Sequence, residues 1–179
     1  MPRKTTETRG SGKTIIRVFC EGESEQAYTE FLKRRFSDVA VIKYPKETGL
    51  FNNAENRFAK DPQYRDYVEV IDEVWFFFDV EADDADLWDQ RMKIINKIRK
   101  LRKKPNIRVR LLMTTGCIEY WLMLHYKMYT PPLQTVADKE RVINELVAEE
   151  PTYKKGDVDA TIMVPAIQTT AMQKNVNMV

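Results

Sequence analysis

The sequence predicts an α/β protein with a mostly parallel, four-stranded sheet and helices on both faces. Two observations lead to this fold class. An apolar, β-branched run at residues 15–20 passes directly into a segment with helical spacing of its apolar side chains, and the same pattern recurs where the run at residues 73–78 precedes a helix at residues 87–103. Strands that alternate with helices along a chain form parallel sheets covered on both sides.

The residues that follow the first two predicted strands indicate where each strand ends. The strand at residues 15–20 stops at Cys20. Glu21 and Gly22 follow it, and then a helix over residues 24–36, for which Ser24 can serve as the N-cap. The next apolar run, residues 39–44, is a second strand that Pro45 terminates. These elements form a first strand–helix–strand unit.

The middle of the chain contains the segment with the largest apolar side chains. Residues 48–53 are expected to form a loop, and residues 54–67 a helix that Pro62 interrupts. Residues 73–78 are apolar at almost every position, as in a parallel strand buried on both faces. We therefore predict that residues 73–78 are a central strand, directly beside residues 15–20.

The second half is predicted to hold one further strand and four helices. Residues 107–113 alternate between apolar and basic side chains, which indicates a strand with one solvated face or edge. A turn at residues 114–116 leads to a short, very apolar helix. The helices of this half are predicted at residues 87–103, 117–127, 136–149 and 160–175.

Length and composition limit the class of protein. A chain of 179 residues is expected to form one domain, here residues 15–179, preceded by a flexible basic arm at residues 1–14. Cys20 and Cys117 lie in apolar surroundings without metal-binding spacing, so we expect reduced thiols and a cytoplasmic protein. No apolar run approaches the length of a membrane span, and we expect no membrane association.

Carboxylates gather at two predicted strand ends. Glu21 and Glu25 follow the first strand, and Asp79 and Glu81 follow the third. Open α/β sheets bind ligands at the carboxyl ends of their strands. We therefore predict that Glu21 and Asp79 lie close enough to share one cation, and that Glu25 is an outer ligand or lies just outside the ligand shell.

Basic residues are concentrated elsewhere. The end of the helix at residues 87–103 carries a basic run that includes Lys100 and Lys103. Cations at a helix end are often simply solvated and favoured by the helix dipole, and phosphate binding is the alternative interpretation. The net charge of +2 does not by itself indicate a partner.

Four short blocks of the sequence resemble the RloB family, whose fold is related to the Toprim domains of topoisomerases, primases and OLD-type nucleases. Residues 20–25 read CEGESE, and residues 78–81 read FDVE, similar to the Toprim Asp-x-Asp. Residues 117–125 read CIEYWLMLH, which is the most specific match, and residues 153–155 read YKK. The resemblance implies a Toprim- or Rossmann-like sheet. Glu81 departs from the pattern, because Toprim proteins usually carry aspartate there.

The resemblance also implies a function. Proteins of this family are regarded as phage-defence nucleases encoded beside restriction–modification genes, and they imply a Mg²⁺-dependent (or Mn²⁺-dependent) site that cleaves phosphodiester bonds of DNA or RNA. The residues implied as metal ligands are Glu21, Asp79 and Glu81. The implied catalytic set adds Glu119 and His125, and Lys154 and Lys155 become candidates for phosphate contacts. His125 follows Glu119 by six residues, about 9 Å along a helix axis, and we expect it not to bind the metal.

Two alternatives remain open at this point. The chain can be a catalytically inactive nucleic-acid-binding or effector protein, which the glutamate at position 81 and a chain end short of the resembled proteins' final segment favour. It can also be a nucleotidyl-transferring enzyme, because primases share the acidic layout, although the sequence contains no zinc-binding segment of the primase type. A partner protein or a homo-oligomer is compatible with each of these.

Overall fold

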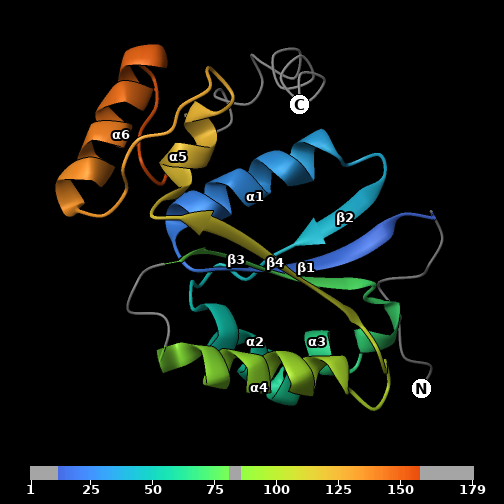
Figure 1. Ribbon diagram of the computed structural model, residues 1–179. Helices are drawn as coiled ribbons and strands as arrows, with labels where there is room; N and C mark the ends of the chain where they lie inside the picture. Colours follow the sequence, from blue (N-terminus) through green and yellow to red (C-terminus); the bar gives the residue numbers. More distant parts are fainter. Residues whose placement is uncertain (1–11, 81–85, 158–179) are drawn as a thin grey trace.

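The computed structural model describes residues 12–80 and 86–157, and these form an α/β fold around a four-stranded sheet (Figure 1). The strands are β1 (Thr14–Cys20), β2 (Ala40–Lys43), β3 (Glu73–Val80) and β4 (Arg108–Thr115). Their order is β2-β1-β3-β4, and every neighbouring pair is parallel. The predicted fold class is confirmed, as is the position of β1 and β3 as adjacent interior strands.

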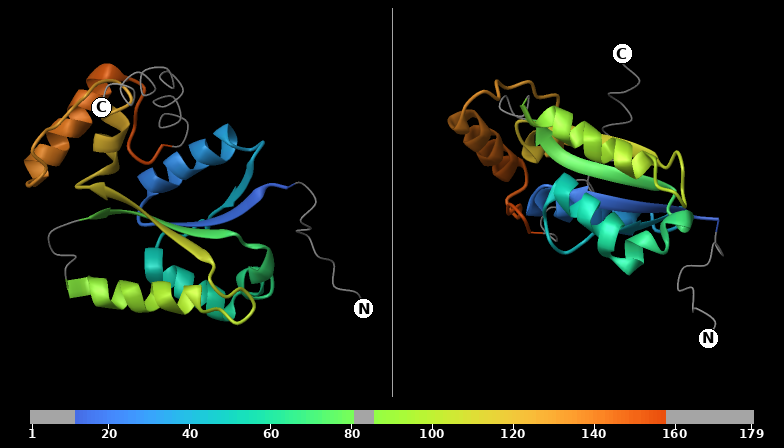
Figure 2. Two further views of the ribbon diagram at one scale, coloured as in Figure 1. Left: turned by 45° about the vertical axis from the view of Figure 1, so that its right-hand side comes forward. Right: turned by 90° about the horizontal axis from the view of Figure 1, so that it is seen from below.

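Helices cover both faces of this sheet. In Figures 1 and 2, one face carries α2 (Leu50–Lys60), α3 (Pro62–Arg65) and α4 (Trp88–Arg99), and the opposite face carries α1 (Glu23–Arg35), α5 (Ile118–Met123) and α6 (Val136–Glu149). A short 3₁₀ turn, Val68–Val70, precedes β3. Because both faces are covered, the central strands can be apolar on both sides.

The core on the α2 and α4 side is aromatic. Phe19 of β1 stacks on Phe76 of β3 with ring centroids 5.8 Å apart, and Phe51 of α2 stacks on Phe76 at 4.4 Å. All three side chains are buried. Such contacts add stability beyond the area that they bury, and they hold α2 directly against the two strands whose ends carry the carboxylates.

Two element boundaries near the strand ends differ from the prediction. The expected loop at residues 48–53 is wrong, since α2 already begins at Leu50, where Leu50 and Phe51 are drawn into the core. The strands β3 and β4 pair as far as Val80 and Thr115, so Asp79 lies within β3, paired with Thr114, rather than after the strand. The predicted turn at residues 114–116 is thereby shortened.

Two helices end earlier than predicted. The α5 helix stops at Met123, and the chain then turns so that Lys127 reaches Glu149 of α6 at 3.0 Å. The α4 helix stops at Arg99, before the densest part of the basic run, and Asn106 takes a positive φ of 61° shortly before β4 begins. In both places tertiary contacts or turn geometry override helical periodicity.

Several predictions concern the ends of the chain. The predicted arm includes residues 1–11, which lie outside the described residues, and Thr14 is already the first residue of β1. The predicted helix at residues 160–175 also lies entirely outside them. In the part of the chain that the structure describes, no helix is long and apolar enough to cross a membrane.

Candidate functional site

The sheet has a topological switch point between β1 and β3. From β1 the chain proceeds to β2 on one side, and β3 and β4 lie on the other. Loops leave in opposite directions at such a point and create a crevice at the carboxyl ends of the strands, where α/β proteins bind ligands. Glu21 follows β1 and Asp79 lies near the end of β3, so both candidates lie at this crevice.

Glu21 connects the two strand ends directly. Its backbone N–H donates to the carbonyl of Phe77 at 3.0 Å, which continues the pairing of β1 with β3 by one residue. Its carboxylate oxygen Oε2 accepts the backbone N–H of Asp79 at 3.0 Å. An aspartate side chain is too short to carry its carboxylate far from its own N–H, so the two carboxylates lie close together, as predicted.

A polar pocket of about 460 Å³ lies beside these two residues. We call it the acidic pocket. Its lining includes Glu21, Glu23, Glu25, Asp79, Glu119 and Lys155. Carboxylates from β1, α1, β3 and α5 thus face one space, and the structure brings Glu21, Asp79 and Glu119 together as the sequence patterns indicated.

Gly22 makes room for the acidic pocket. Its backbone is extended, with φ of −132°, so glycine is not required by the dihedral angle. The requirement is spatial, because a Cβ atom at this position would lie 2.9 Å from Oε2 of Glu25. That same oxygen accepts the Gly22 N–H at 2.9 Å and thereby caps the start of α1.

The surroundings of Glu25 shift its pKa strongly. It is buried in the first turn of α1, and burial raises its pKa to about 7, with further contributions from the negative charges of Asp79 and Glu119. Its backbone hydrogen bonds oppose the shift. Near neutral pH this group can therefore hold or release a proton, a property shared by many general acids and bases.

The pKa of Asp79 is also shifted by its surroundings. Burial raises its pKa, and the charges of Glu119 and Glu21 act in the same direction. Two groups oppose this shift: the hydroxyl of Thr114, which donates to Oδ1 from the neighbouring strand, and Lys139 of α6, whose charge favours the carboxylate. Asp79 of β3 therefore interacts with Thr114 of β4 through a hydrogen bond and with Lys139 of α6 through charge.

Glu119 is completely buried, with 0% of its surface exposed. The hydroxyl of Tyr153 donates to its Oε1 at 2.9 Å, and Nζ of Lys155 lies 3.9 Å from the same oxygen. The other oxygen, Oε2, has no hydrogen-bond partner among the described residues. A buried carboxylate with one unsatisfied oxygen is costly unless a further polar or cationic group joins it.

His125 lies apart from this cluster. It is buried beyond the end of α5, between the rings of Tyr28 and Trp121, at centroid distances of 6.4 and 5.9 Å. Burial lowers its pKa. It does not belong to the lining of the acidic pocket, and the expectation that it does not bind a metal directly stays a prediction. Its catalytic role stays a prediction.

The basic candidates separate into two groups. Lys155 lines the acidic pocket, and Lys154 beside it is exposed. Lys100 and Lys103 lie in the connection from α4 to β4, at the opposite end of the sheet (Figure 1). They can contact nucleic acid bound at the acidic pocket only if it also extends along α4. Glu81, the third predicted metal ligand, lies outside the described residues.

The donor set suits a hard divalent cation. Carboxylate oxygens are the ligands that Mg²⁺ and Mn²⁺ prefer, and the orphaned Oε2 of Glu119 is an available acceptor. Within residues 12–80 and 86–157, no three histidine, cysteine, aspartate or glutamate side chains are placed to hold a metal ion between them. Mg²⁺ usually takes only one or two protein carboxylates and completes its shell with water and substrate phosphate. The residues present therefore fit a site of that kind.

Sequence reasoning missed three contributors. Tyr153 was noticed only as part of a lysine-containing block, although its hydroxyl is the hydrogen-bond donor to Glu119. Thr114 and Lys139 belong to no sequence motif. The role of Thr114 depends on the register of β4 against β3, and that of Lys139 on the packing of α6. For Thr114, a prediction of β3–β4 pairing with the correct register would have placed it opposite Asp79.

The fold and the site together define an α/β protein whose parallel sheet carries an acidic pocket at its topological switch point. The particular family follows from comparison with known proteins. The sequence model of the RloB-like proteins matches residues 16–178, and the chain belongs to this family. No curated protein matches the sequence.

Proposed function

We propose that this protein is a metal-dependent nuclease in which the acidic pocket binds Mg²⁺ or Mn²⁺ and cleaves phosphodiester bonds of DNA or RNA, in phage defence. The observation that carries the proposal is the convergence of Glu21, Glu25, Asp79 and Glu119 on one pocket at the switch point. Ionised carboxyl groups that face one pocket repel one another, and a divalent cation is a partner that relieves this repulsion.

Each side chain has a role in this proposal. Asp79 and Glu21 are the ligands from the two strand ends, and Glu81 adds a third from the sequence pattern. A divalent cation bound there would stabilise negative charge on the phosphate and acidify a bound water. Glu25, with a pKa raised to about 7, is placed to take up or return a proton. Lys155 is placed at the pocket to contact a phosphate.

A second function is favoured by the two lysines near the acids. Lys155 lies 3.9 Å from Glu119, and the charge of Lys139 opposes the rise in the pKa of Asp79 that burial causes. These charges can balance part of the carboxylate cluster without a metal. The protein would then be a nucleic-acid-binding or effector protein that uses the same fold and does not cleave. Metal binding is the property that separates the two functions.

The proposal is tested by titrating the purified full chain with Mn²⁺ in a calorimeter and by incubating it with single- and double-stranded DNA and RNA. Asp79→Asn keeps an acceptor for Thr114 but removes the charge. It should weaken Mn²⁺ binding by more than about 100-fold and abolish cleavage, since even partners one step removed from a metal are typically worth about 10- to 100-fold.

The matched control is Asp38→Asn, which changes an exposed aspartate outside the acidic pocket. It should leave both Mn²⁺ binding and cleavage unchanged. His125→Ala should lower cleavage and retain Mn²⁺ binding, because His125 lies outside the pocket. A wild-type chain that binds nucleic acid but takes up no Mn²⁺ would support the second function and contradict the first.

A further inference from the structure

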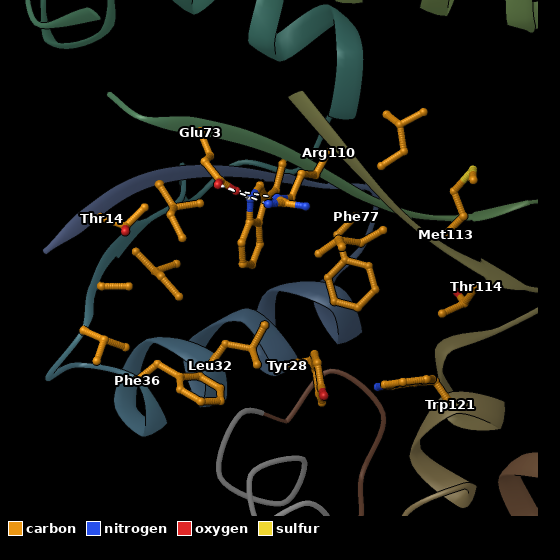
Figure 3. A pocket seen from close by; sticks show the side chains of 17 residues that line it. Thr14, Tyr28, Leu32, Phe36, Glu73, Phe77, Arg110, Met113, Thr114 and Trp121 are labelled. Carbon is orange, nitrogen blue, oxygen red and sulfur yellow. Dashed lines mark hydrogen bonds and ion pairs between the residues drawn. The ribbon is translucent and has the colours of Figure 1, made fainter. Parts of the chain in front are cut away.

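A second cavity, of about 810 Å³, lies on the α1 face of the sheet (Figure 3). We call it the α1 groove. In Figure 3, Tyr28 and Leu32 of α1 and Phe36 just after it form one wall, and side chains of β3 and β4 such as Phe77 form the other. The groove is separate from the acidic pocket, since the two have no lining residue in common.

The rim of the α1 groove is unusually apolar for a surface. Phe36, Val39 and Met113 line it and are 44%, 56% and 51% exposed. Single exposed apolar residues are ordinary, whereas a cluster around one concave surface indicates a binding site or a place that another segment covers.

The floor of the groove has already satisfied its polar groups. The buried carboxylate of Glu73 accepts hydrogen bonds from Trp75 Nε1 at 2.7 Å and from Arg110 Nε at 2.6 Å. Arg108 donates to the same carboxylate at 2.8 Å. Because Glu73 is held by these partners, an apolar occupant that covers the floor would not leave this carboxylate without hydrogen-bond partners.

The described chain ends close to this face. Tyr153 packs in the same hydrophobic cluster as Tyr28 and Phe77, both of which line the α1 groove. Three residues later, Gly156 lies against α1, where a Cβ atom would be 2.9 Å from Oε2 of Glu23. The described chain therefore ends beside the first turn of α1, where Glu23 and Gly156 also line the acidic pocket.

The composition of residues 158–179 suits such a surface. Asp159 and Lys174 are the only charged residues among them. Its apolar residues include Met163 and Val164 before Pro165, and Ile167 and Ala171, which would lie four residues apart on one face of a helix that begins at Pro165. The match to the RloB-like proteins extends to residue 178, so this segment is shared with the family.

The lengths of the segment and the groove also agree. Proline is well tolerated at the first position of a helix, so a regular helix can begin at Pro165, and over residues 165–175 it would be about 16 Å long. The groove is bounded by Trp121 toward one end and by Thr14 toward the other (Figure 3). The seven residues of β1 beneath it span roughly 20 Å at about 3.3 Å per residue.

We propose that residues 160–175 of this same chain dock in the α1 groove as an amphipathic segment, with Met163, Val164, Ile167 and Ala171 directed into it. The segment would cover the exposed side chains of the rim and complete the third layer of the domain on this face. The segment follows Tyr153 and Gly156 in the same chain, so the proposed occupant is covalently linked to the domain that it covers.

Hydrogen–deuterium exchange on the full chain tests this proposal. Amides of residues 167–175 should exchange at least about tenfold more slowly than in an unstructured peptide. Ile167→Asp changes a residue of the apolar helix face and should remove that protection. Gln168→Asp introduces the same charge on the other side of the helix and should leave protection unchanged.

A second pair of variants probes the groove itself. Val39→Asp alters an exposed residue of the rim and should also remove the protection, whereas Val136→Asp, at an exposed valine outside the groove, should not. Unchanged exchange in β1 and β3 confirms that each variant is folded. Unprotected amides in the wild type would overturn the proposal, as would protection that appears only at concentrations where sedimentation detects a dimer, because a second copy would then occupy the groove.

Discussion

The hydroxyl of Tyr153 donates a hydrogen bond of 2.9 Å to Oε1 of Glu119, and both residues are buried. The bond joins the loop after α6 to the first turn of α5. It satisfies one oxygen of a buried carboxylate whose other oxygen, Oε2, has no hydrogen-bond partner among the described residues. The loop that carries Lys155 is therefore tied to the acidic pocket by a buried hydrogen bond.

Tyr153→Phe should destabilise the fold by about 1–2 kcal/mol, because it leaves a buried carboxylate with an unmade hydrogen bond. Urea unfolding measures this change. Tyr44→Phe is the matched control, since Tyr44 donates to Glu30 at 3.0 Å but Glu30 is also paired with Lys33 and Arg34. Its cost should not exceed about 0.5 kcal/mol. Equal losses in the two variants would contradict the importance assigned to the Tyr153 bond.

Glu25→Gln should stabilise the metal-free protein at pH 8 and have little effect at pH 4. Burial raises the pKa of Glu25 from 4.5 to about 7. The folded state therefore binds more protons than the unfolded state between these values, and the stability that this provides is lost as the pH rises through 7. Glutamine keeps an oxygen for the Gly22 N–H and removes the charge.

The expected gain at pH 8 is about 1–3 kcal/mol, given roughly 1.4 kcal/mol per pKa unit. Thermal unfolding in the presence of a chelator, at pH 4, 6 and 8, measures the difference between variant and wild type. Glu30→Gln is a control with the opposite sign, because its hydrogen-bonding partners lower the pKa of Glu30. A Glu25→Gln variant whose stability relative to wild type is independent of pH would refute the shifted pKa.

His125 should make the protein sensitive to mild acid. Burial lowers its pKa below the ordinary 6.5, so the unfolded state binds more protons as the pH falls, and stability is lost below about pH 6.5. His125→Leu should reduce this loss between pH 7.5 and 5.5, as measured by the shift in melting temperature. An unchanged shift would mean that His125 has the same pKa in the folded and unfolded states, and would contradict the lowered pKa.

Lys155→Gln should weaken binding to nucleic acid and lower the slope of log affinity against log salt by about one unit, as expected when one phosphate contact is lost. Fluorescence anisotropy at several salt concentrations gives both quantities. Lys103→Gln is the control at the far end of the sheet. If Lys103→Gln has the larger effect, the nucleic acid lies along α4 and the connection to β4 instead of at the acidic pocket.

The central features of the fold were predictable because they rest on local patterns. The runs at β1 and β3 are apolar on both faces, which requires interior positions, and the carboxyl ends of neighbouring parallel strands meet at one edge. Glu21 and Asp79 were placed together on these grounds alone. Predicting the positions of these two residues did not require knowledge of the side chains that surround them.

The features that sequence reasoning did not predict depend on contacts between distant segments. The start of α2 at Leu50 follows from the burial of Phe51 against Phe76, 25 positions further along the chain. The early end of α5 allows Lys127 to reach α6. The pKa of Glu25 depends on Asp79 and Glu119, which only the folded chain brings near. Local periodicity contains no information about such neighbours.

The parallel pairing of β1 with β3 has a consequence for how the chain folds. The contact of Glu21 with Asp79 joins residues 58 positions apart, and closing so long a loop is slow compared with forming the helices. A nascent chain can therefore form α1 and even the β1–α1–β2 unit while its carboxylates are still separated and fully hydrated. The electrostatic penalty of gathering them is imposed only in the late step that docks β3, when most of the apolar core forms at the same time.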